Sequence, residues 1–148
     1  MAEQRREIVF EQESPRVCFG CGPDNPRGLG LRFFETEKGV EVDYRVEPHL
    51  VGAPGVVHGG IQATLLDEAL CMAAYAKHGT PAVTGELTVR YMKPLPSEQD
   101  IVVRGHITEQ RGRSFFAEGE ILIAGSSEVV TRARARLFAM QEDSAAGS

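Results

Sequence analysis

The stretch IQATLLDEALCMAAYAKH, residues 61–78, decides how the rest of the chain folds. It contains no Gly or Pro and consists largely of Ala, Leu, Met, Gln and Glu, which favour a helix. Gly79 provides a helix stop, and Lys77 and His78 add basic side chains to the last turn, where the helix dipole favours them. Because apolar or small residues occupy nearly every side, this helix is predicted to lie in the middle of a fold.

The predicted helix has two faces of different character. A broad apolar stripe comprises Ile61, Leu65, Ala69, Met72, Ala73 and Ala76. A second stripe, which we call the small-residue stripe, comprises Gly60, Thr64, Asp67, Cys71 and Ala74. A ligand or a second subunit can lie along a stripe of such small side chains.

Strand patterns precede and follow the helix. Apolar residues alternate through 29–33 and again through 40–46, which predicts a hairpin around a turn at 37–39. After the helix we expect strands at residues 82–91, 101–107, 115–123 and 129–140, with short turns that imply antiparallel neighbours. The order β-β-α-β-β-β-β predicts an α+β fold, in which one curved antiparallel sheet wraps a long central helix of residues ~60–78.

The length of 148 residues fits one domain, predicted at 14–140, with a flexible N-terminus at 1–13 and a flexible tail at 141–148. Composition is ordinary for a globular protein, with 42% hydrophobic and 25% charged residues. The net charge of −5 disfavours binding to nucleic acid or to an anionic membrane. The charged start lacks the apolar core of a secretory signal, no apolar run reaches the ~18–20 residues of a transmembrane helix, and three cysteines make no disulfide framework. We therefore expect a cytoplasmic protein.

The motif that bears chemistry is His58-Gly59-Gly60 directly before the helix, followed by Asp67 two turns later. Two glycines at a helix start leave backbone N–H groups uncovered and let a ligand approach the main chain. Those donors and the positive end of the helix dipole favour an oxyanion. The same residues also fit a tight turn followed by a solvated carboxylate, and this spacing alone leaves both interpretations open.

The run PGVVHGGIQATLLDEALCMAA, residues 54–74, resembles the signature of hotdog-fold acyl-CoA thioesterases of the phenylacetate-pathway and thioesterase-superfamily type. The segment CFGCGPDNPRGLGLRF, residues 18–33, is similar to the N-terminal segment of one branch of that group, and the likeness extends through Tyr91-Met92-Lys93-Pro94. This resemblance covers roughly residues 17–140 and implies the hotdog fold. It implies hydrolysis of an acyl-CoA with water as second substrate and no cofactor.

The resemblance also implies roles for individual residues. Asp67 matches the nucleophile or general base, and the Gly59 N–H matches the group that polarises the thioester carbonyl. His58 would hold the thioester and the loop, and Thr84 would place a hydroxyl near the attacking water. Such sites are usually completed across a dimer, so a homodimer or a dimer of dimers is expected. The predicted substrate-binding residues are Gly60, Arg90, Met92, Arg113 and Ser114.

Cys18 and Cys21 form a Cys-x-x-Cys pair, but no second cysteine pair or close histidine cluster accompanies them. We therefore expect no metal site and a buried structural role for both cysteines. Glu68 points ~100° away from Asp67 on the helix and is predicted to pair with a cation. Cys71 is expected to pack at an interface.

Two other functions fit the same fold. One is a hotdog hydratase or dehydratase, which would need a second histidine near the helix that this sequence lacks. The other is a non-catalytic acyl-CoA binding module in which Asp67 is structural. Release of thiol from a panel of acyl-CoAs separates catalysis from binding.

Overall fold

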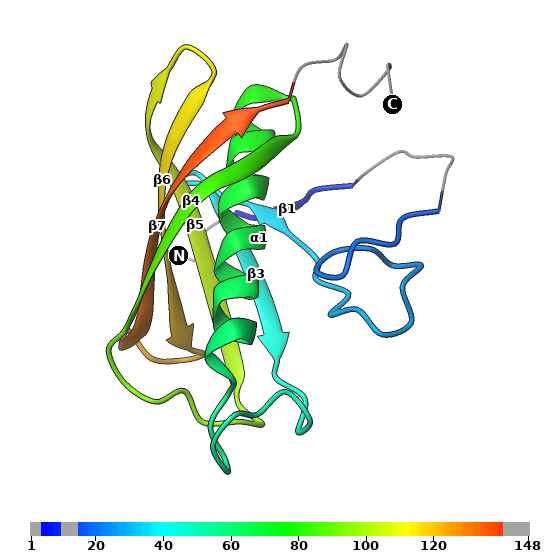
Figure 1. Ribbon diagram of the computed structural model, residues 1–148, viewed down its shortest axis with the longest axis vertical. Coiled ribbons are helices and arrows are strands. Elements are labelled where there is room, and N and C mark those ends of the chain that lie inside the picture. The colour runs from blue at the N-terminus through cyan, green and yellow to red at the C-terminus, as the bar shows by residue number, and fades with distance from the viewer. Residues whose placement is uncertain (1–3, 10–14, 141–148) are drawn as a thin grey trace.

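The computed structural model describes residues 4–9 and 15–140. Most of the flexible N-terminus predicted at 1–13 and the whole tail predicted at 141–148 therefore lie outside the described residues, as does residue 14 of the predicted domain. One long helix packs against a seven-stranded antiparallel sheet, as expected from the sequence (Figure 1). The elements in chain order are β1 Arg6–Glu7, β2 Phe34–Glu35, β3 Val40–Arg45, α1 Gly59–His78, β4 Ala82–Tyr91, β5 Asp100–Arg111, β6 Ser114–Ile123 and β7 Val129–Ala139. The strand order in the sheet is β1-β2-β3-β5-β6-β7-β4.

Helix α1 forms where its sequence predicts it and begins at the two glycines. His58 caps the N-terminus, because its Nδ1 accepts a hydrogen bond from the Gly60 N–H at 2.9 Å. At the other end Gly79 adopts φ 83° and donates its N–H to the carbonyl of Tyr75 at 2.7 Å. A left-handed residue in this place is the usual helix stop and favours glycine.

The core lies between α1 and the sheet, because α1 packs against β3, β4, β5, β6 and β7. Gly105 on β5 lies directly beneath the helix, where an added Cβ would stand 3.0 Å from the carbonyl oxygen of Ala69. A side chain there would push the helix away from the sheet. Small residues on both elements therefore let the helix approach the sheet closely.

Strands β5, β6 and β7 form consecutive hairpins, but β4 does not pair with β5, which follows it in the chain. Residues 92–99 connect β4, at one edge of the sheet, to β5 in its middle. Strand β4 pairs instead with β7, from Ala82↔Ala139 to Tyr91↔Thr131. This makes β4 an edge strand. Ala82 and Thr84 face the helix by alternation, and a bulge between Thr84 and Glu86 shifts the register so that Leu87 faces the helix too.

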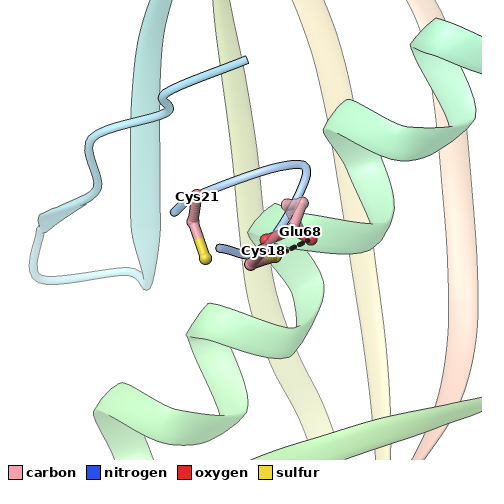
Figure 2. Close-up of side chains that lie close together, drawn as sticks. All are labelled: Cys18, Cys21 and Glu68. Atoms are coloured by element: carbon pink, nitrogen blue, oxygen red, sulfur yellow. Dashed lines mark hydrogen bonds between the residues drawn. The ribbon is translucent and has the colours of Figure 1, made fainter. Parts of the chain in front are cut away.

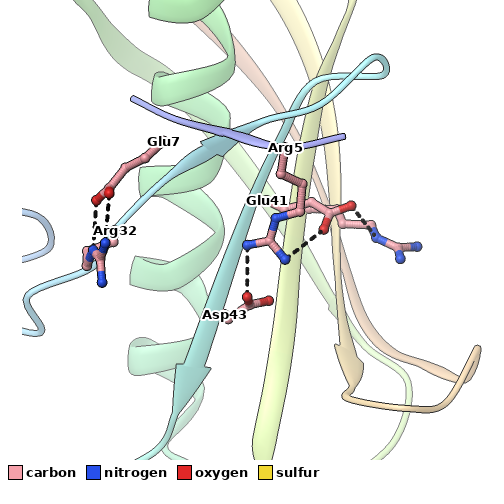
Figure 3. Close-up of polar contacts among 6 residues, drawn as sticks. Arg5, Glu7, Arg32, Glu41 and Asp43 are labelled. Carbon is pink, nitrogen blue, oxygen red and sulfur yellow. Dashed lines mark hydrogen bonds and ion pairs between the residues drawn. The ribbon is translucent and has the colours of Figure 1, made fainter. Parts of the chain in front are cut away.

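The N-terminal part differs from the expectation. Residues 4–9 were assigned to a flexible end, yet Arg6–Glu7 forms β1 against Phe34–Glu35. Figure 3 shows the ion pairs that hold it: Arg32 donates twice to Glu7 at 2.7 Å, and Arg5 donates to Asp43 at 2.8 Å. A two-residue strand held by charges carries no apolar alternation, so the sequence pattern could not reveal it.

The first strand of the predicted hairpin is also shorter than expected. Residues 29–31 bond to the preceding loop rather than to β3, since the Leu29 N–H donates to Phe19 O at 2.7 Å and the Leu31 N–H to Gly20 O at 2.9 Å. Leu29, Leu31 and Phe33 are nevertheless buried. The alternating apolar residues therefore predict correctly which side chains are buried, although residues 29–33 do not form a strand of the sheet. No helix among the described residues is long and apolar enough to cross a membrane.

Candidate functional site

Asp67 and Thr84 meet on the small-residue stripe of α1. Thr84 Oγ1 donates a hydrogen bond to Asp67 Oδ1, and Cys71 Sγ lies 3.2 Å from the same threonine oxygen. All three side chains are half-buried. Burial raises the pKa of the Cys71 thiol to about 11, so it stays protonated beside the carboxylate. The group offers one carboxylate oriented by a hydroxyl, which chemically can act as a general base or a nucleophile.

The start of α1 forms a second polar group. Among residues 4–9 and 15–140, no group accepts a hydrogen bond from the Gly59 N–H. The Gly59 carbonyl accepts a hydrogen bond from the Tyr91 hydroxyl at 2.7 Å, which ties the helix start to the end of β4. An uncovered N–H at a helix N-terminus can donate to an oxyanion.

The two groups do not meet within one chain. Asp67 follows Gly59 by two helical turns, a distance of roughly 12 Å along the helix axis. A carbonyl polarised by the Gly59 N–H is therefore too far from the Asp67 carboxylate of the same chain for attack, which needs reacting atoms about 3 Å apart.

The predicted substrate-binding residues lie in separate places. Arg90 is on the sheet face opposite α1, where it lines a hollow of about 560 Å³ together with Arg104, Arg132 and Arg134. Met92 follows β4 and is exposed. Arg113 and Ser114 lie at the turn between β5 and β6, next to the start of β4, and Arg113 donates to Ala139 O at 2.8 Å. The structure thus places these residues at opposite ends of β4. Arg90 and Met92 flank Tyr91, whose hydroxyl reaches the helix start beside Gly60, and Arg113 and Ser114 lie at the other end.

The sequence alone did not predict two further polar contacts, one made by Gln62 and one by Tyr91. Gln62 is buried in α1; its Oε1 accepts from the Thr131 hydroxyl at 2.5 Å and its Nε2 donates to Val57 O at 3.1 Å. These bonds fix the residue that precedes His58 against strand β7. Tyr91 is the second case, because its hydroxyl reaches Gly59. The apolar neighbourhood of Gln62 within the helix was a signal that a partner was needed.

Cys18, Cys21 and Glu68 form a third group, which differs from the expectation. Cys18 is exposed and Cys21 half-buried, whereas both were predicted to be buried. The loop that carries them lies on the outside of α1, beside Glu68 (Figure 2). Glu68 accepts a hydrogen bond from the Cys18 thiol at 3.5 Å and not from the cation that we expected (Figure 2). Burial raises the pKa of Glu68, and burial and the neighbouring Cys18 raise the pKa of Cys21 to about 12.

Comparison with known proteins adds to this geometry. The model of the thioesterase superfamily matches residues 54–130, which include the helix and the glycines before it. Acyl-coenzyme A thioesterase THEM4 of Rattus norvegicus is 29% identical over 120 residues, which cover 78% of this chain and 51% of that protein. Acyl-coenzyme A thioesterase 13 of Homo sapiens is 31% identical over 93 residues, which cover 62% of this chain and 66% of that protein. The chain thus spans about half to two thirds of these relatives.

The fold is similar to that of solved structures as well. The crystal structure of a thioesterase superfamily protein superposes with a TM-score of 0.74 at 27% identity, and the match covers 84% of this chain and 61% of that one. The long helix and the single antiparallel sheet are therefore shared beyond the segment that the family model matches.

Proposed function

Because the chain belongs to the thioesterase superfamily, we propose that it hydrolyses an acyl-CoA thioester to the free acid and coenzyme A. The observation that carries the proposal is the hydrogen bond from Thr84 to the half-buried carboxylate of Asp67. The small side chains of Thr64 and Cys71 on the same stripe leave room for a ligand beside this carboxylate. The names of the relatives support acyl-CoA as the substrate class.

In the proposed reaction the Gly59 N–H donates a hydrogen bond to the thioester carbonyl oxygen and stabilises the negative charge that develops there. Asp67 takes a proton from water, and the hydroxide forms a bond to the carbonyl carbon. The C–S bond then breaks, and the departing thiolate takes up a proton to give coenzyme A. If Asp67 attacks directly, a mixed anhydride forms first and water opens it afterwards.

We propose that the two halves of the site come from two subunits. The roughly 12 Å between Asp67 and Gly59 on one helix supports this, because one chain cannot bring both to one carbonyl. The outer edge of β4, which pairs with no strand among the described residues, also supports a site shared by two subunits. This edge strand carries exposed apolar side chains at its ends, with Val83 49% and Tyr91 50% exposed. Natural proteins rarely leave a long apolar edge uncovered, and an isologous dimer is the commonest way to cover one.

Coenzyme A carries several phosphate charges, which an acidic chain needs local cations to hold. Arg90, Arg113 and Ser114 remain the proposed contacts, with Met92 against the apolar part of the ligand. The two arginines lie at opposite ends of β4. We therefore propose that one ligand contacts Arg90 of one subunit and Arg113 of the other. A reducing, cytoplasmic compartment remains the proposed location, which the three free cysteines support.

The experiment is release of free thiol from a panel of acyl-CoAs that differ in chain length and in aromatic character. Wild-type protein should hydrolyse at least one of them, and Asp67→Asn should not. Binding of acyl-CoA without any thiol release would favour the non-catalytic binding module instead. A single turnover in ¹⁸O-labelled water, with protein in excess of substrate, tests for direct attack. Label in the Asp67 carboxylate with an unlabelled acid product shows that water opened an anhydride at the Asp67 carbonyl, whereas general-base catalysis puts the label in the acid product.

A further inference from the structure

A side-chain cluster outside the proposed active site joins the N-terminal loop to α1. The sulfur atoms of Cys18 and Cys21 and a carboxylate oxygen of Glu68 all lie within 4.8 Å of one another. Figure 2 shows Cys18 and Cys21 of the loop beside Glu68 of the helix, with the hydrogen bond from Cys18 to Glu68 drawn as a dashed line. Three groups with metal-binding chemistry therefore converge on one point, although Glu68 is far from the cysteines in the sequence.

The loop is built so that this convergence is possible. The Gly22 N–H donates to Cys18 O at 2.8 Å and closes a tight turn around the pair. A Cβ at Gly22 would stand 2.4 Å from the Cys18 nitrogen, and a Cβ at Gly20 would stand 2.3 Å from Cδ of Glu68. Glycine at Gly20 thus lets the carboxylate reach in between the two cysteines, and glycine at Gly22 lets the chain turn back after the second one.

The loop is also tied down on its outer side, away from the cluster. The Arg16 N–H donates to Asp24 Oδ2 at 2.7 Å, and the Asp24 N–H returns a bond to Arg16 O at 2.9 Å. Farther on, the N–H groups of Leu29 and Leu31 bond to Phe19 O and Gly20 O. A long segment without helix or strand is thus held in one conformation on both sides of the cysteine pair. Such pre-organisation holds a ligand set in place.

We propose that Cys18, Cys21 and Glu68 bind one thiophilic divalent cation, with Zn²⁺ as the natural ion and water as the fourth ligand. Two cysteines separated by two residues have the spacing found in tetrahedral zinc sites, and carboxylate oxygen is an accepted third ligand. The exposed side of Cys18 leaves room for the water. Cysteines and histidines alone predict no metal site here, because the third ligand is a glutamate that comes from the helix.

The ion would be structural rather than catalytic. It would attach the loop of residues 15–31 to α1 at the residue next to Asp67, while the Asp67 carboxylate itself points ~100° away, toward Thr84. Because a metal site forms only in the folded chain, its binding free energy adds to the stability of the fold. We therefore expect the metal-loaded protein to unfold at a higher temperature than the chelator-treated protein.

The test uses the full, untagged chain, reduced, treated with a chelator and titrated with Co²⁺. We expect one Co²⁺ per chain, with the near-ultraviolet charge-transfer absorption that thiolate ligands give, and displacement of Co²⁺ by Zn²⁺. Cys18→Ser and Cys21→Ser should abolish the thiolate absorption. Glu68→Gln should weaken Co²⁺ binding at least about 100-fold, because even partners outside the ligand set change metal affinity by 10–100-fold.

Cys71→Ser and Asp67→Asn are the matched controls, since both residues lie on α1 outside the cluster, and both should bind Co²⁺ as the wild type does. The Asp67→Asn result also makes this test independent of the proposed hydrolysis. If the cysteine variants fail to fold, alkylation of the wild type replaces them: Zn²⁺ should protect Cys18 and Cys21. Absence of thiolate absorption, equal affinity in Glu68→Gln, or unprotected cysteines would overturn the proposal.

Discussion

The hydroxyl of Thr84 on the edge strand β4 donates a hydrogen bond to Oδ1 of Asp67 on the central helix. This bond joins two parts of the proposed site: strand β4, whose outer edge pairs with no strand among the described residues, and the small-residue stripe of α1. Thr84 faces the helix by the ordinary alternation of the strand, and the bulge that follows it lets Leu87 face the helix as well. The orientation of the carboxylate therefore depends on β4, which the proposed dimer would also use.

Asp67→Asn should lower kcat on a good acyl-CoA substrate by at least ~10²-fold, the usual scale for loss of a general base. The amide keeps the size of the side chain and can still accept the Thr84 bond, but it neither takes a proton from water nor attacks a thioester. KM should change little, because the carboxylate acts in the transition state. Steady-state thiol release measures both constants.

The control is Asp100→Asn, the same chemical change at an exposed carboxylate whose partner is Arg45. Turnover by this variant should equal that of the wild type. Equal losses in the two variants would mean that charge alone, and not the position of Asp67, determines the rate.

Thr84→Val should lower kcat by about tenfold, since a hydrogen bond to a charged group contributes about 1.5 kcal/mol or more. Valine keeps the branched shape, so packing against α1 is preserved. Thr84→Ser restores the hydroxyl and should recover most of the rate. A serine variant as slow as the valine variant would show that the methyl group, rather than the hydroxyl, is needed.

The fold was largely predictable because its main elements have strong local signals. The helix expected at residues 61–78 is observed at Gly59–His78, and the strand expected at 82–91 is observed at Ala82–Tyr91. Apolar periodicity and helix propensity act within a few residues, so sequence alone carries them. The two-residue strand β1 has no such period, and its formation depends on ion pairs with distant residues.

The candidate site was predictable only in part, for the same physical reason. The resemblance indicated Asp67 and Thr84, and the structure brings them together. The bond from Tyr91 to Gly59 spans 32 residues and the bond from Thr131 to Gln62 spans 69. Contacts of that range depend on strand register and bulges, which no local pattern encodes. The same holds for Glu68 beside the two cysteines.

Gln62→Leu should destabilise the fold by about 2–4 kcal/mol, because it leaves the Thr131 hydroxyl and the Val57 carbonyl without their present partner in a buried place. Denaturant unfolding measures the loss. Adding Thr131→Val should recover part of it, since the second change removes the unpartnered hydroxyl. Strictly additive losses would mean that the two side chains do not interact.

Cys71 should react slowly with iodoacetamide. At about pH 8 a thiol with a pKa of about 11 is roughly 100-fold less ionised than one with the ordinary value of 9.0, and the thiolate is the reactive form. The alkylation rate should therefore rise with pH until the medium approaches that pKa. Peptide mass spectrometry follows the residue.

Two variants should shift this rate in opposite directions. Burial is the main cause of the raised pKa; the Thr84 hydroxyl lowers the pKa of Cys71 and the Asp67 charge raises it. Asp67→Asn should thus speed alkylation and Thr84→Val should slow it. A faster reaction in both would mean that the substitutions simply open the site.

The shared site can be tested by mixing two inactive proteins. Gly59→Pro removes the N–H donor, and proline is tolerated at the first helical position, especially after His58, whose φ of −56° and ψ of 135° suit a residue before proline. Gly59→Ala is the control: it retains the N–H, while its Cβ would stand 3.3 Å from the Tyr91 oxygen. We expect Gly59→Pro to be inactive and Gly59→Ala to retain activity.

Equal amounts of the Gly59→Pro protein and the Asp67→Asn protein are then mixed, unfolded together and refolded. In a mixed dimer one site takes Gly59 from one subunit and Asp67 from the other, both unchanged, while the second site carries both substitutions. Random reassortment should therefore restore about a quarter of the wild-type rate, because half of the dimers are mixed and each has one intact site. If both groups acted within one chain, every site would keep one defect and no activity would return.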